Sequence, residues 1–106
     1  MIEGPKYKVL VSAKAKDMLF EHARFLAQVN IKAGEELFEQ FEEKIGSLEE
    51  MPEWCAPYEN IYLPPGKYRK QGLGKHLFMV FQVLQDTVYI ELILDARAEH
   101  HLKIDK

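Results

Sequence analysis

The sequence predicts an α+β domain in which a strand, a helical hairpin and a three-stranded antiparallel meander follow one another. Residues 6–12 alternate with the two-residue period of a strand, and residues 13–50 carry two apolar stripes with helical spacing. Residues 67–97 are rich in β-branched and aromatic side chains, which favour strands. We therefore expect a single domain, residues 1–106, with the helices packed on one face of a four-stranded sheet and the other face open. The basic residues of the meander, Arg69 and Arg97 among them, are expected on this open face, which is the expected functional surface.

The first strand and the two helices are predicted from the change in apolar period. Over residues 6–12, Tyr7, Val9 and Val11 lie on one side of an extended chain. Apolar residues then recur at steps of three and four over residues 13–31 and again over residues 32–50, which indicates two amphipathic helices. Asn30 interrupts the pattern and is a plausible cap between the two helices, while Pro52 prevents the second from continuing.

The remaining chain is predicted to be a long loop followed by the meander. Residues 51–66 contain four prolines but also several aromatic residues, so we expect an ordered loop. The meander has strands at residues 67–71, 75–84 and 87–95, with a glycine turn at residues 72–74. Both faces of the strand at residues 75–84 are apolar, which places it centrally. Val88, Ile90, Leu92 and Leu94 are expected on one face of the last strand, and residues 98–106 form a polar tail that we expect to be partly ordered.

Charge is distributed unevenly along the chain, although the formal net charge is only −3. Residues 34–53 contain eight glutamates and one lysine, whereas residues 64–76 contain Lys67, Arg69, Lys70 and Lys75 and no acid. The simple interpretation is two solvated faces, and the alternative is that the basic strand meets an anionic partner. The chain has a single cysteine, Cys55, no apolar run long enough to span a membrane, and no leader-like start. These three features favour a cytoplasmic protein without a membrane partner.

Several short motifs, taken in order, carry a family resemblance. They are Tyr7-Lys8-Val9, Ser47-Leu48-Glu49-Glu50-Met51-Pro52, Lys67-Tyr68-Arg69-Lys70, Leu77-Phe78-Met79-Val80-Phe81-Gln82-Val83, Asp86-Thr87-Val88-Tyr89 and Leu94-Asp95-Ala96-Arg97. None is a strict signature alone, but their order and spacing resemble the toxins of the RelE/ParE superfamily of type II toxin–antitoxin systems. The resemblance extends from about residue 7 to residue 101.

The resemblance implies a toxin that a cognate antitoxin holds inactive. RelE-like members cleave messenger RNA on the ribosome, whereas ParE-like members poison DNA gyrase without a known hydrolytic site. We expect ribosome-dependent mRNA cleavage by an endoribonuclease, narrowly ahead of a ParE-like action on gyrase. A third alternative is a domain that has kept antitoxin binding and lost toxicity.

The resemblance also implies site residues, with departures from the family pattern. Arg69 and Arg97 match positions where RelE-like members place functional basic residues, whereas Gln71 and Phe78 stand where a lysine and an arginine are expected. No tyrosine follows Arg97; the candidate proton-exchanging groups near that end are His100 and His101. The expected catalytic set is therefore Arg69, Arg97, His100 and His101, and the expected substrate-binding residues are Lys67, Lys70 and Lys75.

Each of these residues also has a structural interpretation. Lysines and Arg69 on a strand can protect an exposed sheet edge from aggregation, and terminal histidines can belong to a solvated tail. His22 lies on the apolar stripe of the first helix and is more typical of a core margin, and His76 is an equally weak candidate. Cysteine and histidine are too scattered for a metal site, and we expect no cofactor.

Overall fold

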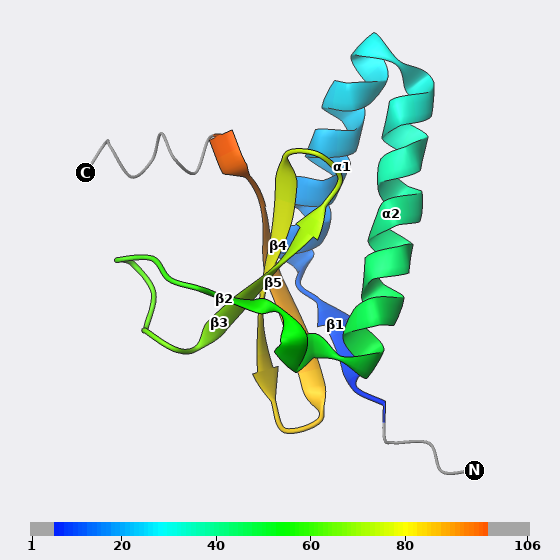
Figure 1. Ribbon diagram of the computed structural model, residues 1–106. Helices are drawn as coiled ribbons and strands as arrows, with labels where there is room; N and C mark the ends of the chain where they lie inside the picture. Colours follow the sequence, from blue (N-terminus) through cyan, green and yellow to red (C-terminus); the bar gives the residue numbers. More distant parts are fainter. Residues whose placement is uncertain (1–5, 98–106) are drawn as a thin grey trace.

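The computed structural model describes residues 6–97 as a five-stranded sheet with two helices packed on one of its faces (Figure 1). The order of the strands across the sheet is β1-β5-β4-β3-β2. The elements are β1 (Lys8–Val11), α1 (Ala13–Val29), α2 (Ile31–Glu50), a 3-10 turn η1 (Pro52–Trp54), β2 (Ala56–Tyr58), β3 (Tyr68–Leu73), β4 (Leu77–Leu84) and β5 (Thr87–Asp95). The predicted α+β architecture is therefore confirmed, with one strand more than expected.

The helical hairpin begins and turns at polar caps. The Ser12 hydroxyl accepts a hydrogen bond of 2.9 Å from the backbone N–H of Ala15 at the start of α1. Asn30 is both the last cap of α1 and the first cap of α2, since its side chain accepts from the backbone N–H of Lys32 at 2.9 Å. The predicted role of Asn30 is confirmed. The two helices approach closely at Gly34, where a Cβ atom would lie 2.9 Å from the carbonyl oxygen of Ala23.

The sheet is mixed and contains a short edge strand that the sequence pattern did not predict. β2 pairs antiparallel with β3, so that Tyr58 lies opposite Tyr68. With three residues and a central proline, β2 has no readable alternation, and proline is tolerated there because the strand lies at the edge. At the other edge, β1 runs parallel to β5, with Val9 beside Val88. The loop predicted over residues 51–66 is thus partly regular.

The meander has the predicted central strand, but its details differ from the prediction. β4 lies between β3 and β5, as the apolar character of both its faces indicated. β3 continues through Gly72 to Leu73, so the turn comes at residues 74–76, where Gly74 has a φ of 68°. The hairpin between β4 and β5 also forms without glycine, because Gln85 takes a positive φ of 57°.

A β-bulge in β5 changes which side chains face the helices. Phe81 lies opposite Ile90 and Val80 lies opposite Leu92, which leaves Glu91 as an extra residue without a partner in the ladder. The extra residue reverses the alternation, so Ile93 packs toward the helices while Leu92 and Leu94 pack on the other face. The prediction that Val88, Ile90, Leu92 and Leu94 share one face is therefore wrong beyond Glu91.

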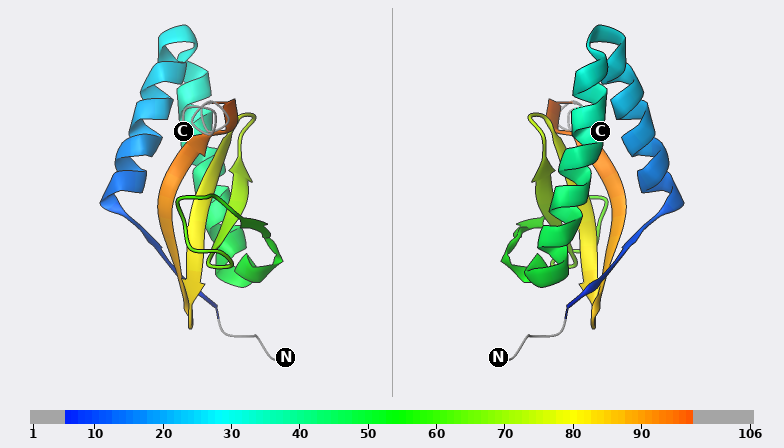
Figure 2. Two further views of the ribbon diagram at one scale, coloured as in Figure 1. Left: turned by 90° about the vertical axis from the view of Figure 1, so that its left-hand side faces the viewer. Right: turned by 90° about the vertical axis from the view of Figure 1, so that its right-hand side faces the viewer.

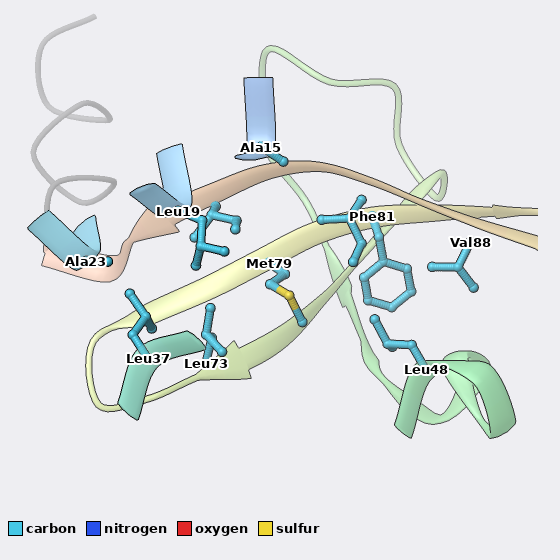
Figure 3. Close-up of a cluster of buried hydrophobic side chains, with 11 residues drawn as sticks. Ala15, Leu19, Ala23, Leu37, Leu48, Leu73, Met79, Phe81 and Val88 are labelled. Atoms are coloured by element: carbon cyan, nitrogen blue, oxygen red, sulfur yellow. The ribbon is translucent and has the colours of Figure 1, made fainter. Parts of the chain in front are cut away.

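Two apolar clusters lie on the two faces of the sheet. The larger, between sheet and helices, is drawn in Figure 3 and contains Ala15, Leu19, Ala23, Leu37, Leu48, Leu73, Met79, Phe81, Val88, Ile90 and Ile93. The smaller contains Tyr58, Tyr68, Phe78 and Val80, with Leu63, Leu92 and Leu94 packed against it. The segment between β2 and β3 passes in front of this second face in the left view of Figure 2, with the helices behind the sheet. Among the described residues, no helix is long and apolar enough to cross a membrane.

Candidate functional site

Four of the seven predicted site residues fall into two regions, which we call the end cleft and the open face. The end cleft lies between the helical hairpin, the β3–β4 turn and the end of β5, and has a volume of about 850 Å³. Its lining residues include His22, Phe25, Glu36, Gln40, Glu43, Lys44, Lys75, His76, Asp95 and Arg97. The open face is the side of the sheet away from the helices and carries the second apolar cluster. Lys75 and Arg97 therefore belong to the first region, and Lys70 belongs to the second.

Arg97 is held by a neighbouring carboxylate in the end cleft. Its Nε and Nη2 atoms donate to the two oxygens of Asp95 at 3.1 and 2.9 Å, and its backbone N–H donates to the same side chain at 2.8 Å. This bidentate hydrogen bonding, with the negative charge of Asp95, raises the pKa of Arg97 above its usual value. Because the negative charge of Asp95 lies against the guanidinium, it partly cancels the positive charge that Arg97 offers to a phosphate.

The end cleft also gathers two histidines that sequence reasoning rated as weak candidates. His22 reaches the cleft from α1, and His76 reaches it from the β3–β4 turn. The backbone carbonyl oxygen of His76 accepts a hydrogen bond from the backbone N–H of Ala96 at 2.8 Å. Glutamates from α2 also line the cleft, and no spacing rule in the sequence predicts their approach. The charged lining is balanced: the cations are Lys44, Lys75 and Arg97, and the acids are Glu36, Glu43 and Asp95.

Arg69 lies on the helix side of the sheet, contrary to the expectation that the basic residues of β3 share the open face. Its Nη1 atom donates to the carbonyl oxygen of Cys55 at 2.8 Å, and Cys55 packs against the larger core. Gln71, two residues on, contacts the sulfur of the same cysteine at 3.7 Å. Because side chains alternate along a strand, Arg69 and Lys70 point to opposite faces. The guanidinium of Arg69 thus stabilises the chain before β2.

Arg69 and Arg97 are also far apart along the sheet. Arg69 is in register with Phe81, whereas Asp95, two residues before Arg97, is in register with Leu77. Four residues of β4 separate the two registers, a span of roughly 13 Å. The structure brings Arg97 and Lys75 to one cleft and leaves Arg69 away from them. His100 and His101 lie outside the described residues, and the catalytic roles of all four residues stay predictions.

The open face combines buried aromatic rings, two exposed lysines and a partly buried polar network. Lys67 Nζ lies 5.8 Å from the centroid of the Tyr68 ring, and Lys70 Nζ lies 5.6 Å from that of Phe78. The Tyr68 hydroxyl donates to Glu91 Oε1 at 3.1 Å, and the Gln82 amide donates to Glu91 Oε2. Burial, followed by the charge and hydrogen bond of Glu91, raises the pKa of Tyr68.

The bulge explains why Glu91 enters this network. As the extra residue of β5, Glu91 projects on the open face beside Leu92, between β4 and β1. Its own backbone carbonyl accepts a hydrogen bond from the Ser12 hydroxyl at 3.1 Å, which fixes the bulge to the first turn of α1. Sequence reasoning did not find this network, because a glutamate within an apolar strand looks the same whether it is bulged or regular.

The Cys55 thiol and the possibility of a metal site remain to be placed. Burial raises the pKa of the Cys55 thiol, an effect that the positive charges of Arg69 and Lys44 only partly oppose, so the thiol stays protonated at neutral pH. Within residues 6–97, no group of three or more histidine, cysteine, aspartate or glutamate side chains is arranged to hold a metal ion.

Comparison with solved structures identifies the fold. A chain from a structure described as the chromosomal ParDE TA system from P. aeruginosa superposes with a TM-score of 0.64 at 16% sequence identity. The match covers 84% of this chain and 95% of that chain. No protein-family model matches the sequence, and no curated protein sequence matches it. The chain therefore has the fold of a component of a ParDE TA system, which is the fold that the sequence motifs predicted.

Proposed function

We propose that this protein is the toxin of a type II toxin–antitoxin system, held inactive in the cytoplasm by a cognate antitoxin. The observation that supports this proposal most strongly is the shared fold, which extends over 84% of the chain and nearly the whole of the matched ParDE chain. The motifs of residues 7–97 support the same family independently of the coordinates.

We further propose that the toxin acts by binding a protein target, as ParE-like toxins bind DNA gyrase, rather than by cleaving mRNA. RNA cleavage needs an excess of cations around the reacting phosphate and a group that takes the 2′-hydroxyl proton. The end cleft has three acids against three cations, and Arg69 is committed to a backbone carbonyl. By contrast, the open face carries the exposed lysines Lys67 and Lys70, and the segment that covers it exposes Ile61 and Tyr62, a composition typical of protein-binding surfaces.

The alternative function is ribosome-dependent mRNA cleavage. One observation favours it: the end cleft gathers His22, His76, Lys75 and Arg97 from elements distant in sequence. Imidazoles exchange protons near neutral pH, so this group has the residue types that a metal-independent ribonuclease uses. In this alternative the end cleft, and not the open face, is the working surface.

Induced expression in a bacterial host separates the two modes of action. We expect growth arrest together with DNA breaks and loss of plasmid supercoiling, while full-length transcripts persist. Cuts in ribosome-bound messages with normal supercoiling would instead establish the ribonuclease alternative. If induction leaves growth unchanged in a host that lacks the neighbouring antitoxin gene, the toxin proposal itself is wrong.

Two variants assign the mode of action to a surface. Lys70→Glu reverses the charge of an exposed lysine on the open face and should relieve the arrest. Lys32→Glu makes the same change at an exposed position at the start of α2, where an acid is favourable, and should remain toxic. The double variant Arg69→Ala/Arg97→Ala should also remain toxic if it folds; under the ribonuclease alternative it loses toxicity.

A further inference from the structure

The helical hairpin carries an apolar groove on the side that the sheet does not cover. This hairpin groove has a volume of about 580 Å³ and is lined by Asp17, Phe20, Ala23, Arg24, Ala27, Ile31, Gly34, Glu35 and Phe38. Phe20 is 61% exposed and Ile31 is 70% exposed, so two large apolar side chains meet solvent here. Neither Phe20 nor Ile31 belongs to an apolar cluster of the sheet, and an exposed apolar patch of this kind is typical of an interaction surface.

The hairpin groove contains both a protrusion and a hollow. The ring of Phe20 packs against that of Phe38, with centroids 5.3 Å apart and planes tilted by 57°, and this contact restricts the orientation of the exposed Phe20 ring. The small residues Ala23, Ala27 and Gly34 form the hollow beside it, because α1 and α2 approach closely at Gly34. A surface with a rigid aromatic ring next to a hollow of small residues is complementary to a second copy of itself.

The charges that flank Phe20 have the same self-complementarity. Asp17 and Arg24 are both exposed on α1 and lie seven residues apart, about 10.5 Å along the helix axis. Arg24 also donates to Glu21 of its own helix at 2.7 Å, and because this pair is exposed, the guanidinium keeps N–H groups for a second carboxylate. The midpoint between them falls between Phe20 and Glu21. When two copies of α1 cross in antiparallel orientation about a two-fold axis at this midpoint, each Asp17 lies opposite Arg24 of the second copy. An isologous contact of this kind forms two ion pairs around a central pair of phenylalanines.

We propose that two copies of this chain associate through the hairpin groove to form a two-fold symmetric dimer. Asp17 and Arg24 carry opposite charges at nearly equal distances on either side of Phe20. This order fits a second copy of the same helix in antiparallel orientation, and binding to an unrelated segment would not call for it. The dimer leaves the open face and the end cleft of each copy accessible, since both regions lie on other sides of the molecule.

Sedimentation of the purified chain tests the dimer directly. We expect a species of twice the chain mass of 12.4 kDa, and we expect Phe20→Lys to shift it to the monomer. Phe25→Lys is the matched control, since Phe25 is equally exposed on α1 at 65% but lines the end cleft, and this variant should remain a dimer. A wild-type chain that is monomeric up to its solubility limit would overturn the proposal.

A charge exchange distinguishes the proposed antiparallel contact from a general effect of surface charge. Asp17→Arg alone places two arginines together, and Arg24→Asp alone places two aspartates together, so each should raise the dimer dissociation constant by at least about tenfold. The double variant exchanges the charges and should return the constant close to that of the wild type. Circular dichroism of each variant checks that α1 remains folded. If the double variant is as weak as the single variants, or if Phe20→Lys stays dimeric and loses antitoxin binding instead, the groove is not a contact between copies.

Discussion

The two faces of the sheet differ in how they are buried, and this difference separates stability from recognition. The helix side holds a continuous core of eleven buried residues drawn from both helices and the strands, with Phe81 and Ile90 wholly inaccessible to solvent. The apolar cluster of the open face has only four buried members, and its cover is a loop rather than a helix. It also carries a carboxylate and two lysines beside its aromatic rings.

This contrast indicates what each face contributes. Burial of apolar area on the helix side provides most of the stabilisation, because this cluster is the larger one and joins both helices to β3, β4 and β5. The open face gains less from burial, but its exposed lysines lie against buried rings, and this contact restricts their positions and lowers the entropy lost on binding a partner. Substitutions on the two faces should therefore differ in both stability and toxicity.

The largest loss of stability is expected from Phe81→Ala on the helix side. Removing a fully buried ring leaves a cavity between the sheet and the helices, and we expect the free energy of unfolding to fall by about 3–5 kcal/mol. Equilibrium unfolding in urea measures this change. A loss below about 1 kcal/mol would mean that the helix side is not the principal core.

Phe78→Ala makes the matched change on the open face. Phe78 is three residues from Phe81 on the same strand, and its ring packs on that of Tyr58 with centroids 5.5 Å apart. We expect a smaller loss, of about 2 kcal/mol, because the covering loop can settle into the space. The same urea titration measures it, and a loss equal to that of Phe81→Ala would remove the proposed difference between the faces.

Glu91→Gln tests the polar network at the bulge. The substitution keeps the shape of the side chain but removes the charge that accepts from Tyr68 and Gln82, and we expect a loss of about 1–2 kcal/mol. Thermal unfolding at neutral pH gives the difference, with Glu39→Gln on the exposed surface of α2 as the control. Equal melting temperatures for the two variants would show that the network does not stabilise the bulge.

The fall in the free energy of unfolding at alkaline pH should depend on Tyr68. Its pKa is raised in the folded protein, so above pH 10 the unfolded chain loses this proton before the folded chain does, and stability falls as pH rises. Tyr68→Phe removes this contribution and should flatten the decline between pH 9 and pH 11 relative to the wild type. Parallel slopes for the two proteins over that range would contradict the assignment.

The smallest effect is expected from Lys70→Ala. The lysine is exposed and its contact with the Phe78 ring is worth about 0.5 kcal/mol, so stability should hardly change. Toxicity should nevertheless fall, because the side chain belongs to the proposed binding surface. Unfolding in urea and growth after induction, measured on the same variant, separate these two effects. A stable variant with full toxicity would exclude Lys70 from the binding surface.

The features that the sequence predicted are those governed by local period and capping. The amphipathic stripes, the joint at Asn30 and the central position of β4 all follow from residue spacing. The unpredicted features depend on tertiary pairing. β2 is too short to have a period, and the bulge at Glu91 exists only relative to β4. For the same reason, the direction of Arg69 was mistaken: its face depends on the register of β3 against its neighbours.

The candidate site was predictable only in part. Lys75 and Arg97 do line one cleft, but the balance of charge around them depends on the glutamates of α2, which the fold brings close. The Tyr68–Glu91 pair joins residues 23 positions apart through two strand pairings and a bulge. A single sequence without a register does not specify such a contact.

The most direct test of the proposed mode of action is a supercoiling assay with purified DNA gyrase and the purified protein. The wild-type protein and Lys32→Glu should inhibit supercoiling or trap cleaved DNA, and Lys70→Glu should not. If gyrase retains full activity with the wild-type protein while ribosome-bound messages are cut, the open face is not the working surface and the protein acts as a ribonuclease.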